Sequence, residues 1–252
     1  MKGKVSMNRL LKVAAPALLV AAIICQSVGF QGVLAKDNVT TASSDHVSNL
    51  TDQQLQALTN PVLQSYKADN SHKVWKMTAD SRLAVLANQT NIENVRLQEV
   101  VKLVNSEFVE KGIISSPLAM VFAQEKDVSY GDILINIDKT NPITNSEEAY
   151  KITIGEDGVR LTGASENAVM HGLRTIQNLA ITNDGLVYGE IMDYPNVAER
   201  RVHVDCARKY ISKDWFIRQI REMSYMKMNA LQIHFSENMG FRIECETDPA
   251  IV

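Results

Sequence analysis

Residues 200–242 hold the side chains of this sequence whose types and spacing best suit chemistry. Asp205 and Arg208 follow one short apolar run, and His234 and Glu237 lie where a second apolar run gives way to polar residues. Carboxylate and imidazole groups can transfer protons, and a guanidinium can bind neighbouring oxygens through its fixed fork of donors. The segment is therefore the first candidate for a functional site.

The elements that must position these side chains form one strand–helix–strand unit. The pattern predicts a strand over residues 200–206, a helix over 213–227 capped by Ser212, and a strand over 230–235. About 30 residues separate the two strand starts, which is the length of a βαβ unit, and a right-handed crossover makes such strands parallel. We expect the polar residues to lie just past each strand.

Residues 72–195 predict a small α+β domain, a sheet with helices on one face. Apolar residues at helical spacing predict one helix over 91–111, ended by Gly112, and a second helix that starts after Ser165. Gly172 falls inside that second helix, and we attribute it to close packing on the sheet. The expected strands are residues 74–77, 83–86, 118–123, 133–137, 148–154 and 159–161. No titratable cluster stands out in this domain, so we predict a structural role for it.

The N-terminal residues predict export. Basic residues precede an apolar run of thirteen, residues 13–25, which is shorter than the roughly 20 apolar residues of a spanning helix. We predict a signal peptide over 1–35, cleaved after Ala35, and a secreted or cell-surface protein that has no membrane attachment after cleavage. Residues 36–71 are mostly polar and predict a flexible linker.

Composition excludes several classes of function. The net charge is −3 and the pI near 6, without a basic stripe, which argues against nucleic-acid binding. None of the three cysteines forms a CxxC pair, so nothing predicts a zinc or iron–sulfur site, and we expect no metal and no cofactor. A disulfide between Cys206 and Cys245 and two separate thiols both remain open.

Several separated motifs resemble glycoside hydrolase family 20, the exo-acting β-N-acetylhexosaminidases and lacto-N-biosidases. The resemblance covers residues 72–252 and rests mainly on Asp193-Tyr-Pro, on Arg200, Asp205 and Arg208, and on the segment 229–242. The helix segment 167–179 also looks like the last helix of that family's non-catalytic α+β domain. The family places this domain before a (β/α)8 barrel whose site lies at the carboxyl ends of the strands.

The resemblance implies roles for individual residues. Arg200 matches the arginine that binds hydroxyls of the terminal N-acetylhexosamine. Glu237, with His234 beside it, matches the acidic residue that supports the catalytic acid through a histidine on a later strand. Asp205 and Arg208 match positions near the end of the first strand, where an ion pair that fixes the turn is the favoured interpretation over a direct site role.

The sequence also departs from the family. Arg201 stands where glycine is common, Gln232-Ile233 replaces His-Trp, and Glu237-Asn238 replaces a pair of aspartates, a form closer to the lacto-N-biosidase-like branch. The sugar, the linkage and the oligomeric state are left open. Family chemistry is substrate-assisted: the 2-acetamido oxygen attacks the anomeric carbon while an Asp-Glu pair on the fourth strand orients it and protonates the leaving oxygen.

That catalytic pair has no counterpart here. The 252 residues contain no segment like His-x-Gly-Gly-Asp-Glu, and Glu147-Glu148 opens a strand of the small domain. We therefore expect the first βαβ unit of a truncated barrel, residues 196–252, in an N-terminal portion that is inactive alone. The alternative is a secreted, non-catalytic carbohydrate-binding or interaction module.

Overall fold

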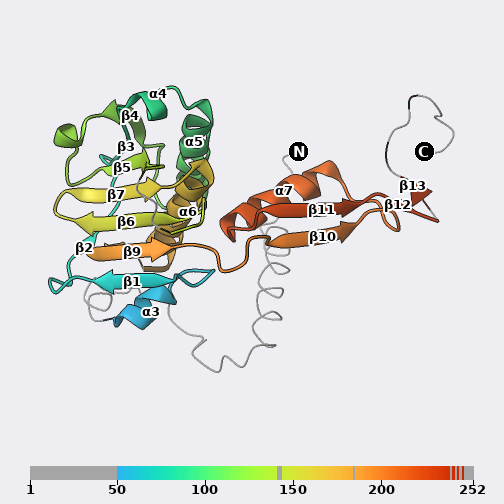
Figure 1. Ribbon diagram of the computed structural model, residues 1–252, viewed down its shortest axis with the longest axis horizontal. Helices are drawn as coiled ribbons and strands as arrows, with labels where there is room; N and C mark the ends of the chain where they lie inside the picture. The colour runs from blue at the N-terminus through green and yellow to red at the C-terminus, as the bar shows by residue number, and fades with distance from the viewer. Residues whose placement is uncertain are drawn as a thin grey trace, which may run out of the picture. The chain divides into compact units, whose positions relative to one another are not determined.

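The computed structural model describes residues 50–140, 144–183, 185–238, 240–241, 243 and 246, all within one compact unit of residues 42–252 (Figure 1). The predicted signal peptide and most of the predicted linker lie outside the described residues. Within the described ranges, no helix combines the length and the apolar character that crossing a bilayer requires.

The largest sheet of the described chain has seven strands and is mixed. Its strand order is β1-β9-β6-β7-β5-β3-β4. The strands from β7 to β4 run parallel to their neighbours, whereas β1, β9, β6 and β7 pair antiparallel. The strand bounds are β1 Ser65–Ala68, β3 Arg82–Leu86, β4 Ala119–Ala123, β5 Ile133–Ile137, β6 Tyr150–Gly155, β7 Gly158–Gly163 and β9 Gly189–Asp193. Two short strands, β2 Val74–Trp75 and β8 Leu186–Val187, pair separately.

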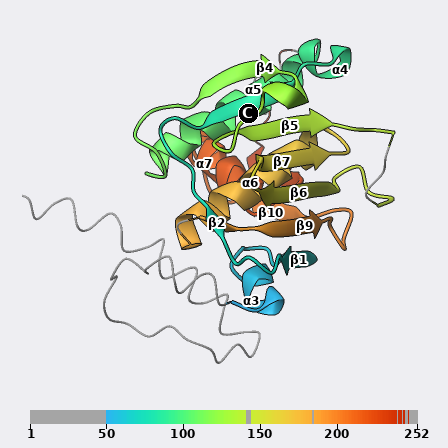
Figure 2. The same ribbon diagram turned by 90° about the vertical axis from the view of Figure 1, so that its left-hand side faces the viewer.

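Helices α5 (Val95–Glu110) and α6 (Glu166–Asn183) cover one face of this sheet, as predicted (Figures 1 and 2). Their apolar faces share one core with the strands. Gly172 explains how closely α6 approaches, because a Cβ there would lie 2.3 Å from Leu161 Cδ1 on β7. Gly112 follows α5 with φ +73°, the left-handed conformation that favours glycine after a helix.

Two predictions about the first half of the chain need correction. The helix expected over 91–111 is two helices, α4 (Gln89–Ile92) and α5, because Asn94 caps α5 through a side-chain bond to the Leu97 amide at 2.9 Å. Residues 50–71 are not a flexible linker. They form α3 (Asp52–Gln56) and β1, which pairs with β9 along the edge of the sheet.

The polar composition of that segment hid a few well-spaced anchors. Leu55, Leu63 and Tyr66 are buried in the main core. The Tyr66 hydroxyl donates to the Val187 carbonyl at 2.8 Å, and burial raises the pKa of that phenol. These buried side chains and the pairing of β1 with β9 attach the segment, although its mean composition resembles that of a linker.

The predicted βαβ unit is confirmed. Strands β10 (Arg201–Asp205) and β11 (Ala230–His234) pair in parallel as a sheet of their own, joined by α7 (Lys213–Tyr225), whose N-cap is Ser212. Helix α7 ends in the hydrogen-bond pattern of a Schellman motif: the Met228 amide donates to the Met223 carbonyl, and the Lys227 amide donates to the Ser224 carbonyl.

The left-handed position of that motif is held by Lys227, at φ +56°, where glycine is the usual residue. The unit then leads into two short paired strands, β12 (Ser236–Glu237) and β13 (Gly240–Phe241). Elsewhere in the described chain a short 3-10 turn, Glu125–Asp127, precedes β5.

Candidate functional site

Four of the five predicted site residues meet at the carboxyl ends of β10 and β11. Asp205 and His234 are register partners at the ends of the two strands. Arg208 Nη2 lies 3.3 Å from both Glu237 carboxylate oxygens, and His234 Nε2 lies 3.8 Å from Glu237 Oε1. We call Asp205, Arg208, His234 and Glu237 the strand-end cluster.

Within this cluster Asp205 has a clear structural task. Its Oδ1 accepts the backbone amide of Ala207 at 2.9 Å, and its Oδ2 lies 3.9 Å from Arg208 Nε. These contacts support the favoured interpretation that Asp205 and Arg208 fix the turn after β10. The Arg208 side chain is 70% exposed, so its ion pairs contribute at most about 1 kcal/mol. The Glu237 side chain is 25% exposed and lies between Arg208 and His234. It is therefore the carboxylate of this cluster that remains available to bind another group.

The structure does not bring Arg200 to the strand-end cluster. Arg200 precedes β10, so the length of a five-residue strand, roughly 16 Å, lies between it and the other end. Its side chain donates to the carbonyls of Lys227 and Val197, each at 2.8 Å, and forms an ion pair with Glu148. Sugar binding by Arg200 stays a prediction, and the observed contacts give it a structural task.

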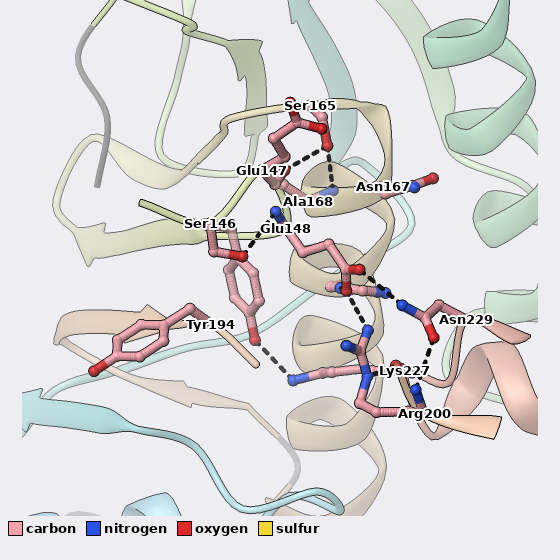
Figure 3. A network of polar contacts seen from close by, with 12 residues as sticks. Ser146, Glu147, Glu148, Ser165, Asn167, Ala168, Tyr194, Arg200, Lys227 and Asn229 are labelled. Carbon is pink, nitrogen blue, oxygen red and sulfur yellow. Dashed lines mark hydrogen bonds and ion pairs between the residues drawn. The ribbon is translucent and has the colours of Figure 1, made fainter. Parts of the chain in front are cut away.

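Arg200 belongs instead to a polar network that joins the α+β domain to the βαβ unit (Figure 3). Glu148, just before β6, pairs with Arg200 and accepts from Asn229 Nδ2 at 3.0 Å. Asn229 Oδ1 accepts the Arg200 amide at 2.9 Å, which closes the ring of contacts. His171 lies on α6, and its Nδ1 is 3.5 Å from Glu148 Oε2.

A second buried ion pair completes this network. Lys227 Nζ donates to Asp193 Oδ2 at 2.9 Å and to the Tyr150 hydroxyl at 2.8 Å, and that hydroxyl donates to the same carboxylate at 2.7 Å. The other Asp193 oxygen accepts the amide of Gln64 at 3.1 Å. Lys227 is only 6% exposed, and Tyr150 is fully buried. We call the whole set the junction network: Glu148, Tyr150, His171, Asp193, Arg200, Lys227 and Asn229.

The environment shifts the titration of three of these groups. Burial lowers the pKa of His171 to about 4, against the attraction of Glu148, and the cations Lys227 and Arg200 lower it further. Burial also lowers the pKa of Lys227, an effect that the Asp193 carboxylate opposes. Burial and the charge of Asp193 raise the pKa of Tyr150 well above its usual value. The network thus pairs Arg200 with Glu148 and Lys227 with Asp193, and its His171 imidazole is neutral at pH 7.

This network was not predicted from the sequence. No titratable cluster was expected in residues 72–195, and Glu148 was expected only to open a strand, because its partners come from positions far apart in the chain. The one available signal was a lysine at the position after a helix end, where glycine is usual.

The predictions about a metal, a cofactor and a disulfide are not decided by the structure. Among the described residues no three His, Cys, Asp or Glu side chains are grouped to hold a metal ion. Cys206 is buried and Cys245 lies outside the described residues, so their pairing stays open.

Two family models match consecutive parts of the chain. The model "Glycosyl hydrolase family 20, domain 2" matches residues 61–194, and "Glycosyl hydrolase family 20, catalytic domain" matches residues 199–252. The first match alone covers more than half of the chain.

Curated relatives with similar sequences are β-hexosaminidases and a chitobiase. Beta-hexosaminidase B of Pseudoalteromonas piscicida is 28% identical over 112 residues, 44% of this chain and 14% of the relative. The N,N'-diacetylchitobiase of Vibrio harveyi is 30% identical over 121 residues, 45% of this chain and 14% of the relative. The chain therefore matches only a small part of the relatives' length.

Solved structures share the fold. A Flavobacterium johnsoniae chitobiase superposes with a TM-score of 0.63 at 18% identity, over 80% of this chain and 30% of that one. A β-N-acetylhexosaminidase of Streptomyces coelicolor superposes with a TM-score of 0.61 at 20% identity, over 79% and 38%.

Proposed function

Because this chain belongs to glycosyl hydrolase family 20, we propose that it supplies the α+β domain and the first strands of a (β/α)8 barrel in a secreted β-N-acetylhexosaminidase-type glycosidase. The change from the first family match to the second carries the proposal. It falls over residues 195–198, between the last strand of the seven-stranded sheet and the separate parallel pair β10–β11. The matched domain of the family and the sheet to which the chain contributes thus change at the same place.

The proposed reaction is retaining hydrolysis of a terminal N-acetylhexosamine or lacto-N-biose, assisted by the substrate's acetamido group. Within this proposal Glu237 supports the catalytic acid. Its position supports this role, because the ends of parallel strands are where barrel enzymes place their reactive groups. Arg208 Nη2 donates to both Glu237 carboxylate oxygens at 3.3 Å, which fixes the direction in which this carboxylate lies. A charged carboxylate can orient a histidine from another strand by accepting its N–H.

The same proposal makes the 252-residue chain inactive alone. The reaction needs an aspartate that orients the acetamide and a glutamate that follows it directly, and no aspartate of the sequence is followed directly by glutamate. In the strand-end cluster, Asp205 is committed to its own turn. Neither Asp205 nor Glu237 has another acidic residue directly before or after it in the sequence.

The chromogenic substrates p-nitrophenyl N-acetyl-β-D-glucosaminide and p-nitrophenyl lacto-N-bioside test the proposal. We expect neither to be cleaved by the purified 252-residue chain. A longer protein that contains this chain and continues in the same reading frame past the Val252 codon should cleave at least one of them. Glu237→Gln should lower kcat in that longer protein. Cleavage of neither substrate by such a longer protein would count against the proposed function.

A further inference from the structure

From the edge strand β4 we infer that this chain forms a two-fold dimer, in which β4 pairs antiparallel with β4 of a second copy. β4 is the last strand of the seven-stranded sheet, and among the described residues β3 is the one strand that pairs with it (Figure 2). Its outer side therefore presents backbone groups to which another strand can bond. The inference concerns an edge of the α+β domain and does not depend on the proposed hydrolysis.

Strand β4 lacks the features by which proteins usually protect a sheet edge. Residues 112–124 contain no charged side chain, and the strand itself contains no proline. The opposite edge of the sheet differs. There β1 carries Lys67, and Asp52 of α3 accepts the backbone amide of Ala68 at 3.1 Å. One edge of the sheet is thus charged and partly occupied, whereas β4 is neither.

The hydrogen bonds of β4 show which of its backbone groups face outward. The Ala123 carbonyl accepts the Ala87 amide, just after β3, at 2.9 Å, so the backbone groups of Ala123 face the sheet. Because these groups alternate in direction along a strand, those of Met120 and Phe122 face away from β3. An antiparallel partner that sets Met120 opposite Phe122 of the second copy would bond all of these outward groups.

The sequence of β4 favours a second copy as the partner. Ala119-Met120-Val121-Phe122-Ala123 reads small, large, β-branched, large, small from either end. A two-fold axis at Val121 sets alanine opposite alanine, Met120 opposite Phe122, and Val121 opposite itself. This register is the one that the outward backbone groups require. A strand paired with its own copy also brings like charges together, which destabilises a sheet, and β4 carries none.

The pairing would bury apolar surface on both faces of the sheet. Met120 packs half-buried against the main core, so Phe122, two residues further along, lies on the same face and is 45% exposed. In the dimer it would pack against Met120 of the second copy. On the other face Val121 is half-buried against a small cluster that includes Ala84 and Leu134. Val121 of the second copy would extend this cluster.

Sedimentation velocity of the 252-residue chain over a concentration series tests the inference. We expect a monomer–dimer equilibrium with a dissociation constant of about 100 μM, the weak affinity of a small interface. Phe122→Lys should raise this constant by roughly tenfold or more, because it places charge on the paired edge. Ile181→Lys is the matched control, since Ile181 is 46% exposed on α6, which packs over β6 and β7, and it should leave the equilibrium unchanged.

Three results would overturn the inference. A chain that stays monomeric would leave this edge to a different extended strand. Association beyond a dimer would also contradict it, because two-fold pairing uses up the β4 edge. A dimer that Phe122→Lys leaves intact, or that Ile181→Lys weakens equally, would place the contact elsewhere.

Cysteine cross-linking tests the register and does not depend on the lysine variant. The two-fold axis sets position 121 opposite its own copy in a non-hydrogen-bonded pair, with the Cα atoms about 4.5 Å apart, which a disulfide can span. Diamide, which takes up the hydrogen atoms of two thiols, should therefore join Val121→Cys chains into covalent dimers. Ala119→Cys is the control, because position 119 lies opposite position 123. Equal covalent dimer from both variants, or none beyond that of the unmodified chain, would refute the two-fold pairing.

Discussion

His171 should make the folded chain lose stability on mild acidification. The imidazole is 8% exposed, and burial lowers its pKa to about 4 from the usual 6.5. It is surrounded by charges from several elements: Glu148 before β6, Asp193 on β9, Arg200 before β10 and Lys227 after α7. Lys227 and Arg200 oppose a third cation, and the two carboxylates only partly compensate.

The sign follows from where the proton binds. Below pH 6.5 the unfolded chain takes up a proton on this histidine and the folded chain does not, so acidification stabilises the unfolded state. The difference amounts to about 1.4 kcal/mol per pH unit between the two pKa values. The free energy of unfolding should therefore fall by about 2 kcal/mol between pH 7 and pH 5, and continue to fall until the folded chain is protonated near pH 4.

Urea unfolding measured across pH 5–7 checks this value. His171→Gln removes the titration and should flatten the profile by about 2 kcal/mol relative to the unmodified chain. His203→Gln is the control, since His203 is exposed on β10 and its loss should leave the pH dependence in place. If His171→Gln and the unmodified chain show parallel pH profiles, the imidazole is not held neutral, and the electrostatic account of the junction network is wrong.

Two further predictions concern packing around the same junction. Lys227→Met should destabilise the chain by about 3–5 kcal/mol, because it leaves the Asp193 carboxylate buried without its cation. The same substitution in an Asp193→Asn background should cost clearly less, and equal costs in urea unfolding would rule out the pair. Gly172→Ala should destabilise by about 1–3 kcal/mol, because the added Cβ would lie 2.3 Å from Leu161 Cδ1. Gly155→Ala is its control, with no atom within 4 Å of the added Cβ, and thermal unfolding should show little change there; similar losses in both variants would contradict the packing argument.

Most of the α+β domain could be predicted from the sequence because its elements carry local signals. The apolar stripe of α5 and the β6–β7 hairpin are short-range patterns, and both occur within a few residues of the predicted bounds. The attachment of residues 50–71 could not be predicted in the same way. It depends on pairing with β9, more than a hundred residues away, and on a few anchors such as Tyr66.

The two candidate sites differ in the same way in how far they could be predicted from the sequence. The strand-end cluster could be predicted because a parallel pair of strands brings Asp205 and Glu237 to one edge wherever the rest of the chain lies. The junction network could not, since Glu148, Asp193 and Lys227 come from three separate elements with no spacing rule between them. Arg200 was predicted from a resemblance at one position, whereas its contacts are set by this three-dimensional junction.

We propose that these 252 residues, which belong to glycosyl hydrolase family 20, lack the catalytic pair of that family and are inactive alone. Release of nitrophenol from p-nitrophenyl N-acetyl-β-D-glucosaminide by the purified 252-residue chain tests it most directly. We expect release no faster than in buffer, from a chain that shows cooperative unfolding. Release above that background, abolished by Glu237→Gln, would contradict it and would place the catalytic acid within this chain.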